Sequence, residues 1–128
     1  MPLPIELPRE SLLLRIFIGE DDRWRDQPLV EALVLRAREM HLAGATVVRG
    51  AIGFGKSSRL HTSRLLRLSQ DLPVIIEIVD TEEKINSFLP VIDQMMTGGL
   101  VTLEKAQVIR HVAENEHREK RAVSGPAK

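Results

Sequence analysis

Two segments with a helical apolar period each lie between strand-like apolar runs, and this order constrains the fold more than any other feature of the sequence. The strand-like runs are residues 11–19, 45–52, 73–79 and 100–110. The first and third are almost continuously apolar, as expected for strands inside a sheet, and the third is rich in β-branched side chains. The last run is less hydrophobic, which predicts a strand at the edge of the sheet.

The first helical segment follows a charged loop at residues 20–27. Four apolar residues and one histidine recur there at helical spacing: Val30, Leu33, Val34, Ala37 and His41. Pro28 is suited to the first helical position, and Gly44 to the left-handed residue that ends a helix. We therefore expect the first helix between these two residues.

The second helical segment is expected to begin with a capping box formed by Asp80 and Glu83 and to end at residues 97–99. Its buried stripe comprises Ile85, Phe88, Leu89, Ile92, Met95 and Met96. Pro90 lies inside this helix and is expected to kink it, because a backbone donor is lost there.

The order strand, helix, strand, strand, helix, strand predicts an α+β protein. Its expected architecture is a ferredoxin-like βαββαβ sandwich, an antiparallel sheet with two helices on one face. The strands carry apolar residues at successive positions, so both faces of the sheet need to be covered. A monomer would expose a large apolar patch, which predicts a homo-oligomer.

Composition narrows the class of protein. The 128 residues, 43% of them hydrophobic, fit one domain. We expect an N-terminal extension at 1–10, the folded domain at 11–112 and a mobile tail at 113–128. Equal numbers of basic and acidic residues, 18 each, and 3% aromatic residues argue against nucleic-acid binding. The sequence has no cysteine, no apolar run of about 20 residues and no signal-peptide pattern, so we expect a cytoplasmic protein not embedded in a membrane.

Residues 50–57 (GAIGFGKS) match the phosphate-loop pattern G-x-x-x-x-G-K-[ST] of nucleotide hydrolases. That motif requires a preceding strand, a following helix and a larger parallel sheet around them. Here the first glycine lies within the predicted strand 45–52, and only about 75 residues remain for the rest of such a fold. We therefore expect no enzyme, and a small nucleotide hydrolase is the least favoured alternative.

The same region resembles the PII signal-transduction proteins, in which a G-F-G-basic segment opens a mobile loop. Three further segments resemble that family: residues 76–79 resemble its third strand, Thr97 and Gly98 the start of its B-loop, and residues 106–110 its last strand. The segments LRIFIGE and TGGLVTLE resemble the PII-like group called domain of unknown function 190. The resemblance covers about residues 11–111.

This resemblance implies a homotrimer that binds an adenine nucleotide in clefts between subunits and contacts a membrane transporter or an enzyme through its loop. Carried onto this sequence, the nucleotide- or anion-binding residues are Gly53, Phe54, Gly55, Lys56, Glu77, Val79, Thr97, Gly98 and Arg110. Ser57 stands where the family has glutamine, and the B-loop is shortened. ATP, ADP, AMP, a cyclic nucleotide and another small anion therefore remain open as ligands.

The 53–71 loop is basic and is the expected docking element for a partner protein. Its candidate contact residues are Arg59, His61, Arg64 and Arg67. A solvated flexible loop is an equally simple interpretation, and a ligand-free interaction module of the same fold is the main alternative function. The four histidines show no metal-ligand spacing, so no metal site is expected. Glu77 lies in an apolar strand and is expected either to face outward or to pair with a cation.

Overall fold

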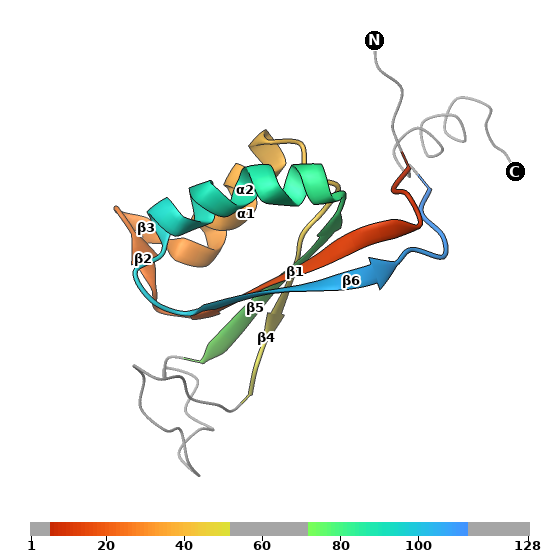
Figure 1. Cartoon of the computed structure of the whole chain (residues 1–128). Coiled ribbons are helices and arrows are strands. Elements are labelled where there is room, and N and C mark those ends of the chain that lie inside the picture. Colours follow the sequence, from red (N-terminus) through yellow and green to blue (C-terminus); the bar gives the residue numbers. More distant parts are fainter. Residues whose placement is uncertain (1–5, 52–71, 113–128) are drawn as a thin grey trace, which may run out of the picture.

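The computed structural model describes residues 6–51 and 72–112. Its four long strands are β1 (Glu10–Gly19), β4 (Thr46–Arg49), β5 (Pro73–Asp80) and β6 (Leu100–Gln107). They form one antiparallel sheet in the order β4-β5-β1-β6. Helices α1 (Leu29–Glu39) and α2 (Glu82–Met95) lie together on one face of this sheet (Figure 1). The predicted α+β ferredoxin-like βαββαβ fold is confirmed.

The alternation of residues along β1 and β5 separates a helix-covered face from an open face. In β1, Leu14, Ile16 and Ile18 are buried, and in β5, Val74, Ile76 and Ile78 are buried. Because successive side chains of a strand point to opposite faces, these residues meet the helices. The helices contribute Leu33 and Ala37 from α1 and Ile85, Phe88, Ile92 and Met95 from α2 to the same core.

The start of α1 differs from the expectation. Pro28 is the N-cap, with φ −61° and ψ 135°, so the helix begins at Leu29. Pro28 is also part of a short hairpin, β2 (Arg23–Trp24) with β3 (Gln27–Pro28), inside the segment expected to be a charged loop. The hairpin is held at its base because the Leu29 N–H donates to the Asp22 carbonyl at 2.8 Å.

The end of α1 lies earlier than Gly44. The left-handed residue is His41, with φ 63°, and the Leu42 N–H donates back to the Ala37 carbonyl at 3.1 Å. The prediction for Gly44 was wrong. The helix ends at Glu39 and its last carbonyls are already satisfied before Gly44 is reached.

The start of α2 lies one residue later than predicted. Thr81 is the N-cap, and its hydroxyl accepts a hydrogen bond from the Lys84 N–H at 3.1 Å. Asp80 instead ends β5 and is buried, and its carboxylate accepts hydrogen bonds from the N–H groups of Ala43 and Thr81. The expected Asp80–Glu83 capping box is therefore wrong. The helix continues through Pro90 to Met95.

The two edge strands are shorter than predicted. The second predicted strand, 45–52, is observed as β4 over four residues, and the last, 100–110, ends at Gln107. The edge position expected for β6 is confirmed. Residues 1–5, 52–71 and 113–128 lie outside the described residues, so the expected N-terminal extension, basic loop and mobile tail stay predictions.

Candidate functional site

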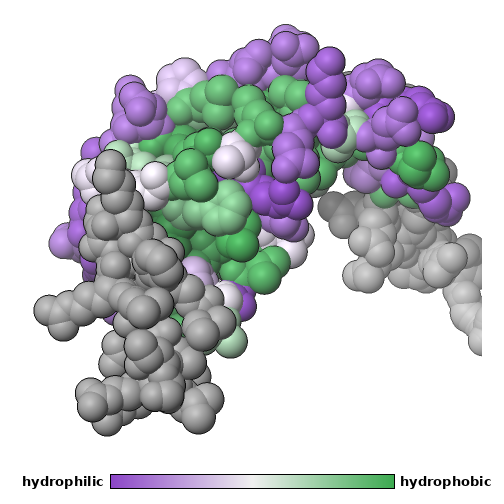
Figure 2. Space-filling view, turned by 60° about the horizontal axis from the view of Figure 1, so that its bottom comes forward, coloured by the Kyte–Doolittle hydropathy of each residue, from purple (hydrophilic) through white to green (hydrophobic). Residues whose placement is uncertain are grey.

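The sheet face turned away from the helices is largely apolar. In the strand register, its apolar residues are Leu13, Phe17, Val48, Ile75, Val79, Leu100 and Ala106. Figure 2 brings this side of the molecule forward and shows hydrophobic atoms gathered there, interrupted by hydrophilic ones. We call this surface the open face.

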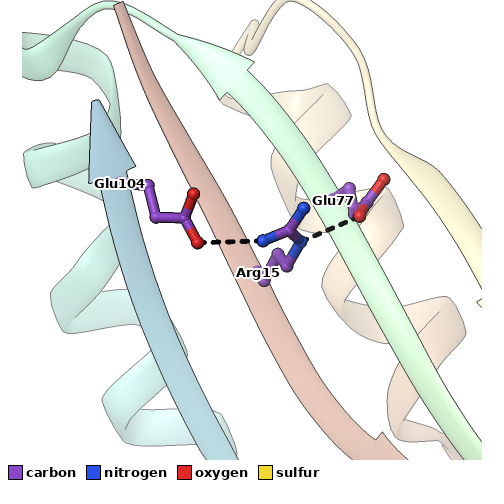
Figure 3. Close-up of polar contacts among 3 residues, drawn as sticks. All are labelled: Arg15, Glu77 and Glu104. Carbon is purple, nitrogen blue, oxygen red and sulfur yellow. Dashed lines mark hydrogen bonds and ion pairs between the residues drawn. The ribbon is translucent and has the colours of Figure 1, made fainter. Parts of the chain in front are cut away.

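A row of charged side chains crosses the open face. Arg15 in the central strand β1 donates through Nε to Glu77 Oε2 of β5 at 2.9 Å and through a terminal nitrogen to Glu104 Oε2 of β6 at 3.0 Å (Figure 3). The side chains are 33% exposed for Arg15, 35% for Glu77 and 58% for Glu104. We call these three residues the charged row. Glu77 is thus both outward-facing and paired, and its cation is Arg15.

Arg15 is the residue that the sequence analysis missed. It interrupts the apolar run of the first strand, and nothing in the local pattern gives it a role. The signal was long-range, because Arg15 lies directly opposite Glu77 in the β1–β5 register. The hydrogen bond to the Glu77 carboxylate, together with the charges of both glutamates, raises the pKa of Arg15.

A second set of contacts lies at the sheet end where residues 50–51 and 72–73 flank the segment 52–71. The Glu20 carboxylate accepts a charge-assisted hydrogen bond from Arg49, the last residue of β4. The Glu20 N–H donates to the Leu72 carbonyl at 2.8 Å, and the Gly50 N–H to the Pro73 carbonyl at 2.7 Å. Glu20 therefore contacts Arg49, at the end of β4, and Leu72, which follows the segment 52–71.

At the same end of the sheet, a hollow of about 780 Å³ lies between α2 and the start of β6. Its lining includes Gly98, one of the predicted nucleotide-binding residues, together with Pro90, Asp93, Met96 and Val101. Thr97 is the exposed residue just before Gly98. The next residue, Gly99, adopts φ +100°, and a Cβ there would lie 2.5 Å from the Phe17 carbonyl oxygen. This turn therefore requires glycine at position 99.

The structure separates the described members of the predicted ligand site. Glu77 and Val79 lie on the open face, and Thr97 and Gly98 precede β6, whereas Arg110 follows its far end. An extended strand rises about 3.3 Å per residue, so the eight residues of β6 separate its two ends by roughly 25 Å. One chain does not bring these residues to one small ligand. The other predicted site residues lie outside the described residues: Gly53, Phe54, Gly55, Lys56, Arg59, His61, Arg64 and Arg67.

The phosphate-loop alternative does not fit its surroundings. Gly50 follows β4, which is an edge strand of an antiparallel sheet rather than a strand of a parallel one.

In the described ranges 6–51 and 72–112, no group of three or more histidine, aspartate or glutamate residues is placed to hold a metal ion. Within the same two ranges, no helix is long and apolar enough to cross a membrane.

Comparison with sequence families and known proteins gives consistent matches. The sequence model of DUF190 (uncharacterized ACR, COG1993) matches residues 11–108. A UPF0166 protein of Aquifex aeolicus (strain VF5) is 44% identical over 97 residues, which cover 76% of this chain and 91% of that protein. A UPF0166 protein of Methanocaldococcus jannaschii is 31% identical over 102 residues, which cover 79% of this chain and 94% of that protein.

Two solved structures share the fold. A candidate PII-like signalling protein from Thermus thermophilus aligns with a TM-score of 0.59 at 17% identity, covering 80% of this chain and 96% of that one. CPII, a nitrogen regulatory PII-like protein from Thiomonas intermedia K12 solved with ADP, AMP and bicarbonate, aligns with a TM-score of 0.50 at 21% identity, covering 79% and 90%. At these identities the likeness shows the fold, which is PII-like.

Proposed function

Because this chain belongs to the DUF190 family and has a PII-like fold, we propose that it is a PII-like regulatory protein of the cytoplasm. In this proposal it is a homotrimer that binds an adenine nucleotide or another small anion between subunits. It presents the 53–71 loop to a partner protein, either an enzyme or a membrane transporter. It catalyses no reaction of its own.

The observation that carries this proposal is the separation of the candidate ligand residues along β6. Thr97 and Gly98 lie at one end of the strand and Arg110 beyond the other, so a small ligand that touches both sets must contact two copies of the chain. CPII was solved with ADP, AMP and bicarbonate, and its fold is shared by this chain, which supports a nucleotide or small-anion ligand here.

The two edge strands support a closed ring of copies related by rotation. Five exposed large apolar residues lie on the two edges: Val47, Val48, Leu100, Val101 and Leu103. The four strands alternate in direction, so β4 and β6 run in opposite directions. A copy rotated about an axis along the strands places its β4 antiparallel to β6 of the neighbour. Such a closed ring covers the apolar edges and turns the open faces inward.

The ligand-free interaction module is the alternative from another functional class. It shares the fold and the self-association, and it differs only in having no nucleotide site. The nucleotide hydrolase is disfavoured because β4 is an antiparallel edge strand. The three functions predict different results in one experiment.

The experiment is calorimetric titration of the full chain with ATP, ADP, AMP and cyclic nucleotides, with the mass measured by light scattering. We expect a trimer that binds near one nucleotide per subunit without releasing phosphate, and weaker binding after Arg110→Ala. No heat with any of these ligands, and no thermal stabilisation at millimolar concentration, would overturn nucleotide binding and leave the interaction module. Phosphate release that depends on Mg²⁺ and is lost in Lys56→Ala would instead support the hydrolase.

A further inference from the structure

The charged row lies between apolar residues of the open face. On one side of it Leu13 lies opposite Val79, and on the other Phe17 lies opposite Ile75 and Leu100. The row therefore crosses three strands within an apolar surface. The Arg15–Glu77 pair lies on the two central strands and has no net charge. Glu104, the third member, lies on the edge strand β6.

Charges in a surface that becomes buried are expensive unless they are paired. Replacing a buried ion pair by apolar residues of similar size often leaves stability unchanged or raises it. A charged row is therefore a poor means of strengthening an apolar interface. Its physical effect is selective, because an alignment that separates Arg15 from its carboxylates, or presses Glu104 into an apolar neighbour, leaves a charge without compensation.

We infer that the charged row Glu77–Arg15–Glu104 determines the specificity of self-association through the open face, so that a second copy docks in one alignment and one stoichiometry. This inference rests on the proposed homo-oligomer. The partner surface is another copy of this chain, because β4 and β6 run in opposite directions at the two edges and the open face reaches both edges through the exposed Val48 and Leu100. The Arg15–Glu77 pair carries no net charge and can be covered as a unit, while Glu104, 58% exposed, lies on the edge strand β6 that meets the neighbouring copy.

The test compares the oligomer masses of the full chain by native mass spectrometry and sedimentation velocity. The first variant, Arg15→Met with Glu77→Leu and Glu104→Gln, removes the row and keeps side chains of similar size. We expect it to remain associated but to lose the single mass of the unmodified protein and to give several stoichiometries. A single mass equal to that of the unmodified chain, or a folded monomer, would overturn the inference.

A second variant keeps the inference testable if the first aggregates. Arg15→Glu places three carboxylates together and is expected to give a folded monomer. The full reversal, Arg15→Glu with Glu77→Arg and Glu104→Arg, restores the pairing and is expected to restore the single mass. The inference would be overturned if Arg15→Glu and the full reversal were both folded monomers by circular dichroism. Pairing within the row would then not be what determines self-association.

The matched control is the exposed Arg36–Glu39 ion pair of α1, which has a similar N···O distance of 3.2 Å and lies on the outer surface. Arg36→Met with Glu39→Leu is expected to leave the oligomer mass unchanged, and a change there would overturn the assignment to the open face. If the unmodified chain is itself a monomer, the proposed homo-oligomer fails. If it forms one oligomer and the row variants match it, only the specificity inference fails.

Discussion

The carboxylate of Asp80 accepts a hydrogen bond of 2.7 Å from the backbone N–H of Ala43, 37 residues away in the sequence. Its other oxygen accepts from the N–H of Thr81, also at 2.7 Å. Asp80 is 4% exposed and ends β5, while Ala43 lies in the connection between α1 and β4. One buried side chain thus ties the start of α2 to the segment that leads into the edge strand. Lys84 adds a bond from its ammonium group to the His41 carbonyl.

We predict that Asp80→Ala destabilises the protein, because two backbone donors lose their acceptor. Ala43 is exposed and Thr81 half-buried, so water can replace part of the lost bonds, and the expected loss is about 1 kcal/mol for each bond. Chemical denaturation measures it, and Asp93→Ala, at an exposed position of α2, is the control. Equal stabilities of the two variants would show that the Asp80 bonds contribute little.

Glycine at position 99 is predicted to be essential for the turn between α2 and β6. A Cβ at Gly99 would lie 2.5 Å from the Phe17 carbonyl oxygen and 2.8 Å from Met96 Cε, and the residue has φ +100°. Backbone strain of this kind costs about 1–3 kcal/mol before any clash is counted. Gly99→Ala should therefore lower the melting temperature clearly.

The adjacent glycine is the matched control for this substitution. A Cβ at Gly98 meets no atom within 4 Å, so Gly98→Ala should leave the melting temperature nearly unchanged. Gly98→Ala also tests the predicted ligand contact at this residue without disturbing the fold. A large loss of stability in Gly98→Ala, or none in Gly99→Ala, would contradict the geometry of the turn.

The Glu20–Arg49 ion pair is predicted to act locally rather than on global stability. Its side chains are 55% exposed for Arg49 and 30% for Glu20, and pairs at the surface contribute at most about 1 kcal/mol. Glu20→Gln should therefore change the free energy of unfolding little, but speed amide hydrogen exchange at Gly50, whose N–H donates to Pro73. Unchanged exchange at Gly50, with Asp26→Asn in the hairpin as a control, would show that Glu20 does not hold this end of the sheet.

The fold was predictable from the sequence because its signals are local. The apolar runs of β1 and β5 and the stripe from Ile85 to Met95 follow directly from side-chain period. The helix ends were not predictable in the same way. Asp80 fits a capping residue by its local pattern, but its carboxylate is used by Ala43, far away in the sequence. His41 similarly replaces Gly44 as the left-handed residue.

The candidate site was predictable only in part. Glu77 was correctly expected to face outward or to pair with a cation, but its partner Arg15 depends on strand register. The separation of Thr97 and Gly98 from Arg110 is likewise a property of the folded sheet. The resemblance implies a site between subunits, and within one chain these residues lie at opposite ends of β6.

The pH dependence of self-association is predicted from Arg15. Its pKa is raised by the Glu77 hydrogen bond and by the two carboxylate charges. A cation with a raised pKa contributes its full stabilisation below its ordinary pKa and loses it only as the pH rises through the raised value. The oligomer of the unmodified chain should therefore keep its Arg15 contribution at every pH up to about 11. In Arg15→Lys, the same carboxylates hold the lysine pKa above its ordinary value of about 10.4, so association should weaken above that pH and before it does in the unmodified protein. Equal behaviour of both proteins in sedimentation across this range would contradict this role.

The most direct test of the central claim is complementation between two binding-deficient variants. Lys56→Ala and Arg110→Ala oligomers are mixed, allowed to exchange subunits and titrated with the nucleotide that the unmodified chain binds. If each site takes Lys56 from one copy and Arg110 from its neighbour, mixed oligomers contain some intact sites, and we predict that tight binding returns in the mixture. Binding that stays as weak in the exchanged mixture as in the separate variants would contradict a ligand site formed between subunits.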